Sequence, residues 1–189
     1  MNDVLKNKIA LRLLNAKTET LGHPAETWYS SSRKAIQTIY GKDWRLFAKC
    51  LAATSPNATL AANVTLARKA FNQIKDTGTI RRESFCRTHY RCLLCVCKGR
   101  IPNGRKVRAF YLALTGDENQ VVIDVWMMRY AGYANKSPNN TQYALIADRI
   151  TEEAEKLGRT PAAHQAVLWS TIRGAGESYD RYLLQYRLF

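Results

Sequence analysis

Along most of this chain the apolar residues recur every three or four positions, the spacing of helices that bury one face. The first such segment places its apolar residues at Val4, Ile9, Leu11 and Leu14. Further helices are predicted where a proline or capping residue precedes an apolar run and a glycine follows it. Their ranges are 25–41, 43–54, 58–75, 83–97, 105–116, 125–132, 141–158, 160–174 and 178–189.

Two segments of the chain need further interpretation. The short β-branched run from Gln120 to Asp124 admits a strand, but an aspartate directly before an apolar run is better explained as the N-cap of a helix. The glutamates of the range 141–158 and its Gly158 stop predict an exposed amphipathic helix. With nine or ten helices and short loops, the sequence predicts an all-α, multi-helix fold in a single domain over residues 1–189.

The length and the hydropathy pattern narrow the class of protein. A chain of 189 residues can bury a core. No apolar run approaches the roughly 18 residues that span a bilayer, and the N-terminus is charged and amphipathic without a signal-peptide pattern. We therefore expect a cytoplasmic protein with no membrane partner.

The net charge is the most informative feature of the composition. The chain carries 29 Lys and Arg against 15 Asp and Glu, a net charge of +14. Such an excess favours a polyanionic partner, most often nucleic acid, and the basic residues are densest between Arg81 and Arg108. The alternative is a generally basic protein that has no polyanionic partner.

Five cysteines without a secretory signal indicate reduced thiols. Four of them, Cys86, Cys92, Cys95 and Cys97, have the spacing C-x5-C-x2-C-x-C, which admits zinc or an iron-sulfur cluster. The same stretch also has the pattern of an apolar helix end, where cysteine is a small hydrophobic residue. The second interpretation is favoured, so no metal and no cofactor are expected.

A turn rich in proline and glycine separates the helices predicted over 83–97 and 105–116. Unpaired backbone N–H groups at the start of the second helix, with Arg100, Gly104 and Arg105 beside them, predict a site for a backbone phosphate. Lys106 follows in the first turn of that helix. It is either a solvated first-turn residue or an amine activated by partial burial and neighbouring positive charge.

Asp124 supplies the second reactive group. A carboxylate partly withdrawn from water can stabilise an oxocarbenium-like sugar cation, although Asp124 as a helix cap is also a structural residue. An amine nucleophile together with such a carboxylate is the pair of groups that cleavage of an N-glycosidic bond requires. Lys106 and Asp124 are therefore candidate catalytic residues.

The stretch from Gly104 to Arg129 resembles the helix-hairpin-helix DNA glycosylase superfamily, whose hairpin ends in G-P-K and is followed by an apolar helix and a V-D pair. The resemblance implies that Lys106 attacks the sugar C1′ and forms a Schiff base, and that Asp124 assists departure of the base. The hairpin motif would occupy about 84–115. The sequence departs from the family at I-P-N-G-R-K, where the family pattern is one residue longer.

Two further stretches resemble the 8-oxoguanine DNA glycosylase branch. The first, from Phe47 to Phe71, implies that Thr54, Ser55 and Asn57 border the lesion. The second, P-A-A-H-Q-A-V-L-W-S, implies that Gln165 contacts the edge of an extruded base and that Trp169 stacks on it, with His164 as a further pocket residue. The related endonuclease branch carries an iron-sulfur cluster after its catalytic aspartate, and that cluster is ruled out here because no cysteine follows Cys97.

The expected partner is double-stranded DNA with a modified or damaged base, bound by a monomer that associates with the nucleoid through the DNA. The expected reaction is base excision, with strand nicking by β-elimination as an optional second step. One alternative is thymine hypermodification, in which phage-encoded relatives of this fold are thought to act. Another is a DNA-binding module without catalysis. The sequence does not identify the base.

Overall fold

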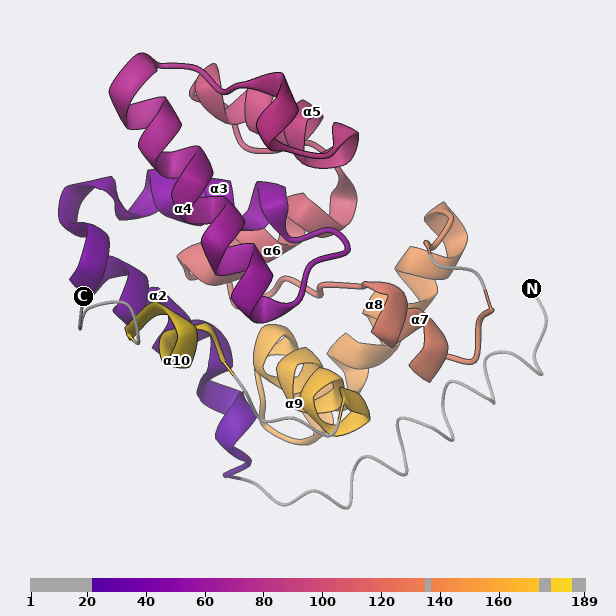
Figure 1. Cartoon of the computed structure of the whole chain (residues 1–189). Coiled ribbons are helices and arrows are strands. Elements are labelled where there is room, and N and C mark those ends of the chain that lie inside the picture. The colour runs from indigo at the N-terminus through magenta and orange to yellow at the C-terminus, as the bar shows by residue number, and fades with distance from the viewer. Residues whose placement is uncertain (1–21, 135–136, 174–177, 185–189) are drawn as a thin grey trace. The chain divides into compact units, whose positions relative to one another are not determined.

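The computed structural model describes residues 22–134, 137–173 and 178–184, and every regular element in these ranges is a helix (Figure 1). The predicted all-α, multi-helix fold is confirmed, and the segment 120–124 forms no strand. None of the described helices combines the length and the apolar character that crossing a membrane demands. The predicted segment with Val4, Ile9, Leu11 and Leu14 lies outside the described residues.

The chain divides into two compact units. One, called here the α7–α9 unit, comprises Met1–Tyr29 and Glu118–Glu177; the other, the α2–α6 unit, comprises Ser30–Asp117 and Ser178–Phe189. The helices are η1 (Pro24–Thr27), α2 (Trp28–Tyr40), η2 (Gly41–Asp43), α3 (Trp44–Thr54), α4 (Leu60–Thr77), η3 (Arg82–Ser84), α5 (Arg87–Cys97), α6 (Arg105–Thr115), α7 (Val125–Tyr130), α8 (Asn140–Lys156), α9 (Pro161–Arg173) and α10 (Tyr179–Leu184).

In the α2–α6 unit, α3 is the central helix and packs against α4, α5 and α6. Most of its side chains are buried, and Phe47 and Leu51 are fully enclosed. The Phe47 ring stacks on Tyr40 at a centroid distance of 3.8 Å and meets the edge of Phe71. The apolar run of α3 therefore forms a helix buried by its neighbours, as predicted.

Local signals explain most helix ends, with two corrections. Thr59 caps α4 through a hydrogen bond from the Ala62 N–H, and Gly78 ends it with a left-handed backbone. Asp43 occupies the predicted cap position of α3, but its side chain makes no capping bond and instead pairs with Lys75 at 2.9 Å. The helix predicted from residue 83 was also wrong at its start, because η3 and an extended Phe85 precede α5.

In the α7–α9 unit, α9 contacts η1, α7 and α8. A buried apolar cluster joins α7, α8 and α9, and its members include Ile123, Met127, Met128, Ile146, Ile150 and Leu168. Because α7 has only six residues, its stability depends on this packing and on its cap.

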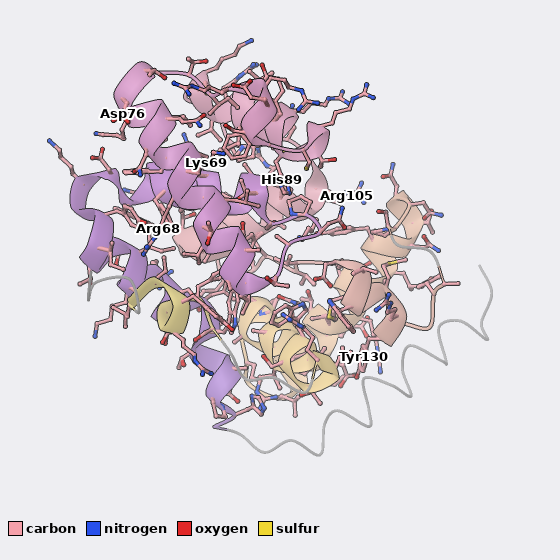
Figure 2. The ribbon with its side chains drawn as sticks, in the orientation of Figure 1. Arg68, Lys69, Asp76, His89, Arg105 and Tyr130 are labelled. Atoms are coloured by element: carbon pink, nitrogen blue, oxygen red, sulfur yellow. The ribbon has the colours of Figure 1, made fainter. Side chains whose placement is uncertain are left out.

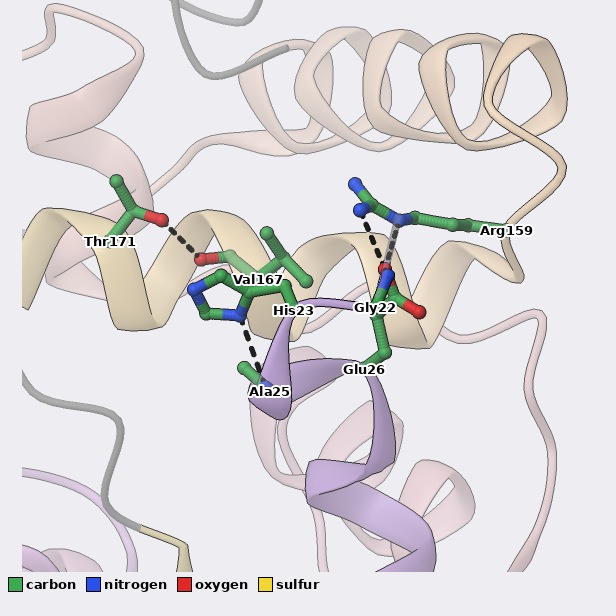
Figure 3. Close-up of polar contacts among 7 residues, drawn as sticks. All are labelled: Gly22, His23, Ala25, Glu26, Arg159, Val167 and Thr171. Carbon is green, nitrogen blue, oxygen red and sulfur yellow. Dashed lines mark hydrogen bonds and ion pairs between the residues drawn. The ribbon is translucent and has the colours of Figure 1, made fainter. Parts of the chain in front are cut away.

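An ion pair fixes η1 to the connection between α8 and α9. Glu26 Oε1 lies 2.6 Å from Arg159 Nη2 and accepts a further hydrogen bond from the Gly22 N–H (Figure 3). Burial acts to raise the pKa of Glu26, but the hydrogen bonds from Arg159 and Gly22 outweigh it, and the pKa lies below its usual value. The same close-up shows His23, whose Nδ1 accepts a hydrogen bond from the Ala25 N–H at 3.1 Å. His23 is thereby the N-cap of η1.

The helix predicted over 141–158 was expected to be exposed, and one of its glutamates is not. The Glu153 side chain of α8 has no exposed surface. Its Oε1 lies 2.6 Å from Arg149 Nη2 and 3.5 Å from Lys156 Nζ, at the spacings i−4 and i+3 on the same helix. A carboxylate withdrawn from water in this way depends on its cations.

Arg149→Gln is expected to lower the free energy of unfolding by about 3 kcal/mol, because Glu153 would stay buried with its shortest ion pair lost. Arg149→Gln combined with Glu153→Gln should lose less than Arg149→Gln alone. Glu152→Gln removes only the exposed partner of Arg149 and should cost less than about 1 kcal/mol. Urea unfolding followed by circular dichroism measures all three; equal losses for Arg149→Gln and Glu152→Gln would contradict the expectation.

Candidate functional site

In the α2–α6 unit, the turn 98–104 joins α5 to α6, and both helices pack against α3. Gly99 and Gly104 have φ angles of +70° and +99°, which are conformations that favour glycine. The Gly99 and Arg100 N–H groups donate to carbonyls in the last turn of α5, and Lys49 Nζ donates to the Gly99 carbonyl at 2.6 Å. The segment of the predicted hairpin, about 84–115, therefore contains two helices joined by a turn that is tied to α3.

This hairpin and the segment before it carry an exposed basic surface. Figure 2 shows Arg105 and His89 on the two neighbouring helices of the hairpin. The single acidic residue between 81 and 108 is Glu83. The exposed basic residues there are Arg81, Arg82, Arg87, Arg91, Lys98, Arg100, Arg105 and Arg108, called here the basic hairpin face. The concentration of charge expected from the sequence is therefore on the protein surface.

Lys106 is the second residue of α6 and is half-buried. Its Nζ lies 3.2 Å from the Ser55 hydroxyl oxygen and 3.4 Å from the Ser55 carbonyl oxygen. The carbonyl accepts a hydrogen bond from the amine, which holds the amine at a defined place behind the hairpin turn. The structure thus brings together Lys106 and Ser55, two of the residues that the sequence assigned to the site.

Thr54 and Asn57, the other two residues predicted to border the lesion, have different surroundings. Thr54 is fully buried, and its hydroxyl bonds to Asn63 Oδ1 at 2.6 Å, while Asn63 Nδ2 donates to the Tyr179 hydroxyl at 2.5 Å. Asn57 is exposed, with a left-handed backbone at φ 57°. Thr54 therefore joins α3 to α4, and of the three predicted lesion-border residues only Asn57 is exposed.

Asp124, in the α7–α9 unit, is the N-cap of α7, as predicted. Its Oδ1 accepts the Trp126 N–H at 2.9 Å and the Met127 N–H at 3.1 Å. Its Oδ2 accepts the indole N–H of Trp169 at 3.0 Å. Each oxygen is thus held in a fixed direction, and the carboxylate joins the start of α7 to the last turns of α9.

The predicted base-pocket residues of α9 are His164, Gln165 and Trp169. Gln165 is 3% exposed and its Oε1 accepts a hydrogen bond from the Tyr29 hydroxyl at 2.8 Å. His164 has no exposed surface. Trp169 is partly exposed and meets the edge of Trp28 at 5.9 Å. Of the three, Trp169 is the one that a ligand can reach without displacing protein.

Three residues that sequence reasoning missed are linked to Trp169 by successive contacts between guanidinium groups and rings. The Arg173 guanidinium carbon lies 4.3 Å from the centre of the Trp169 ring and 5.9 Å from that of Trp126, and the Arg129 guanidinium carbon lies 4.8 Å from Trp126. The signal was present in the sequence, since arginine follows tryptophan by three positions in α7 and by four in α9. We call Trp126, Arg129, Trp169 and Arg173 the tryptophan–arginine ladder.

The cysteines are free thiols, and Cys50, Cys92 and Cys95 are buried. Burial raises the pKa of Cys50 to about 12 and raises the pKa of Cys92 and Cys97 as well. In the part of the chain that the structure describes, no three His, Cys, Asp or Glu side chains are grouped to hold a metal ion.

Lys106 belongs to the α2–α6 unit and Asp124 to the α7–α9 unit. These features define an all-α protein with a basic helical hairpin. Its Asp124 caps a helix and accepts a hydrogen bond from a tryptophan. The chain belongs to DUF7178, a family of unknown function whose model matches residues 7–176. No curated protein and no solved structure matches it.

Asp124→Ala is expected to lower the free energy of unfolding by about 1–2 kcal/mol, since α7 loses its N-cap. Asp124→Ser should recover most of that loss because serine caps a helix about as well as aspartate. Chemical denaturation compares the two variants. If alanine and serine are equally destabilising, the cap bonds are not what Asp124 contributes.

Proposed function

We propose that this protein binds DNA and cleaves the N-glycosidic bond of an extruded modified or damaged base. Lys106 is the nucleophile and Asp124 the assisting carboxylate. The observation that supports this most directly is the half-buried amine of Lys106 in the first turn of α6, just behind an exposed basic hairpin. A half-buried lysine in such a place has limited hydration, a condition under which amines act as nucleophiles.

The proposed reaction begins with the neutral Lys106 amine attacking the sugar C1′. The bond from C1′ to the base nitrogen breaks, the base leaves with the bonding electron pair, and the amine gives up a proton. Opening of the sugar ring then converts the C1′–N bond to an imine. Asp124 would stabilise the positive charge that develops on the sugar while the base departs. This role requires both residues to reach the same nucleotide.

DNA binding is proposed to use the basic hairpin face. The Arg100 and Arg105 side chains are exposed, and Gly104 brings bare backbone to the start of α6. Backbone N–H groups and guanidinium groups in such a turn bind phosphate without reading the base sequence. Recognition of one base would then depend on its extrusion from the duplex.

Arg105→Gln is expected to weaken duplex binding on all sequences to a similar extent and to reduce the slope of log Kd against log salt concentration by about 1, since one phosphate contact is lost. Lys42→Gln, an equal change of charge at an exposed position of η2, is the control and should leave the slope almost unchanged. Fluorescence anisotropy at several salt concentrations gives both slopes. Equal changes for the two variants would show that only net charge matters.

Borohydride trapping tests the reaction. Reduction of the imine should leave a covalent complex with a lesion-bearing duplex, and Lys106→Ala should abolish it. Lys106→Arg keeps the positive charge but cannot form the imine, so it should bind DNA and give no adduct. Asp124→Ser keeps the helix cap and should slow adduct formation at least tenfold. An adduct that persists in Lys106→Ala would refute the assignment of the nucleophile.

The same samples distinguish the alternatives. If hydroxymethyluracil DNA and an amine give a modified base instead of a released one, the protein is a base-modifying transferase that uses this site. Salt-sensitive duplex binding with neither product would identify a DNA-binding module.

A further inference from the structure

Beyond the basic hairpin face, a second cationic surface lies in the α7–α9 unit. It is the tryptophan–arginine ladder, in which guanidinium groups alternate with indole rings. Figure 1 shows α7 and α9, from which all four residues come. Trp126, Trp169 and Arg173 are partly exposed and Arg129 is exposed, so the ladder reaches the protein surface.

Arg173 lies between the two indole rings, 4.3 Å from Trp169 and 5.9 Å from Trp126. Stacking uses the flat faces of the guanidinium group and leaves its N–H donors in the plane, pointing outward. Among the described residues, none forms a hydrogen bond or an ion pair with this guanidinium. A fixed, outward-directed fork of donors is the arrangement that binds a phosphate in bidentate fashion.

The neighbouring carboxylate does not neutralise this charge by an ion pair. Both Asp124 oxygens accept N–H groups, from the start of α7 and from Trp169. The indole of Trp169 is therefore oriented by Asp124 and presents its ring to Arg173. Burying an arginine stem between rings also limits its rotamers, which lowers the entropy lost on binding.

We propose that the ladder binds an unpaired stretch of a DNA strand, with Arg173 on a phosphate and Trp126 stacked on an adjacent base. Aromatic rings next to cationic groups are the common chemistry of single-strand binding, because every base offers a face for stacking and every linkage a negative charge. The net charge of +14 favours the same partner. This binding requires neither Lys106 nor bond cleavage, so it goes beyond the proposed reaction.

Anisotropy with a short fluorescent oligothymidylate tests the proposal in the full-length chain. Arg173→Gln and Trp126→Leu should each weaken binding about tenfold, since the first variant loses a phosphate contact and the second loses a stacked base. The double variant should be little weaker than either single variant, because the two residues hold the same nucleotide. Trp126→Phe keeps a ring and should bind within about threefold of the parent. It also provides a comparison if Trp126→Leu does not fold.

Lys156→Gln is the matched control, since it removes one charge from an exposed position of α8 in the same unit; because it also loses the 3.5 Å ion pair with Glu153, its folding is verified by circular dichroism. It should weaken binding less than threefold. Equal losses for Lys156→Gln and Arg173→Gln, or no loss for Arg173→Gln and Trp126→Leu, would overturn the proposal. A blunt duplex of the same sequence should be insensitive to Arg173→Gln, and equal sensitivity would overturn the choice of an unpaired strand.

Lys106→Ala separates this inference from the proposed reaction. It should abolish borohydride trapping and leave binding of the oligothymidylate unchanged. Failure of trapping in the parent protein, with the ladder variants still defective in single-strand binding, would refute the reaction and support the ladder.

Discussion

The carboxylate of Asp124 is the constraint on which the α7–α9 unit depends most. Its Oδ1 satisfies two backbone N–H groups that a helix start leaves open, and its Oδ2 fixes the indole of Trp169. A six-residue helix cannot form by itself in water. Its cap and the burial of Met127 and Met128 in the apolar cluster therefore act together.

The same geometry bears on chemistry. Asp124 is held by three N–H donors and Lys106 by the hydroxyl and carbonyl oxygens of Ser55, so neither group depends on solvent for its orientation. Groups fixed in this manner need little reorganisation when charge develops on a bound substrate, which is the main source of electrostatic catalysis. The hydrogen bonds that stabilise each unit are thus compatible with the proposed roles, because they orient the reactive atoms without enclosing them.

The two units offer different recognition chemistry. The basic hairpin face presents many exposed cations with few aromatic rings, which suits the regular phosphates of a duplex. The tryptophan–arginine ladder places its two guanidinium groups over indole rings, which suits bases that have lost their neighbours. The proposed extrusion of a base would require both kinds of contact, one for the intact helix and one for the opened strand.

The sequence by itself determined the all-α class, most helix ends, the Asp124 cap and the hairpin with Lys106 at its second helix. These depend on local signals: helical spacing of apolar residues, capping side chains, and glycines such as Gly78 and Gly116 that take left-handed backbone. Only the tertiary structure decided that Gln165 is buried and bonds to Tyr29, and that Thr54 is buried and bonds to Asn63. It also decided that Glu153 is enclosed and that Trp169 donates to Asp124. The physical reason is that packing of the whole fold selects partners 45 or 136 positions apart. The residue pattern along a single helix does not reveal such partners.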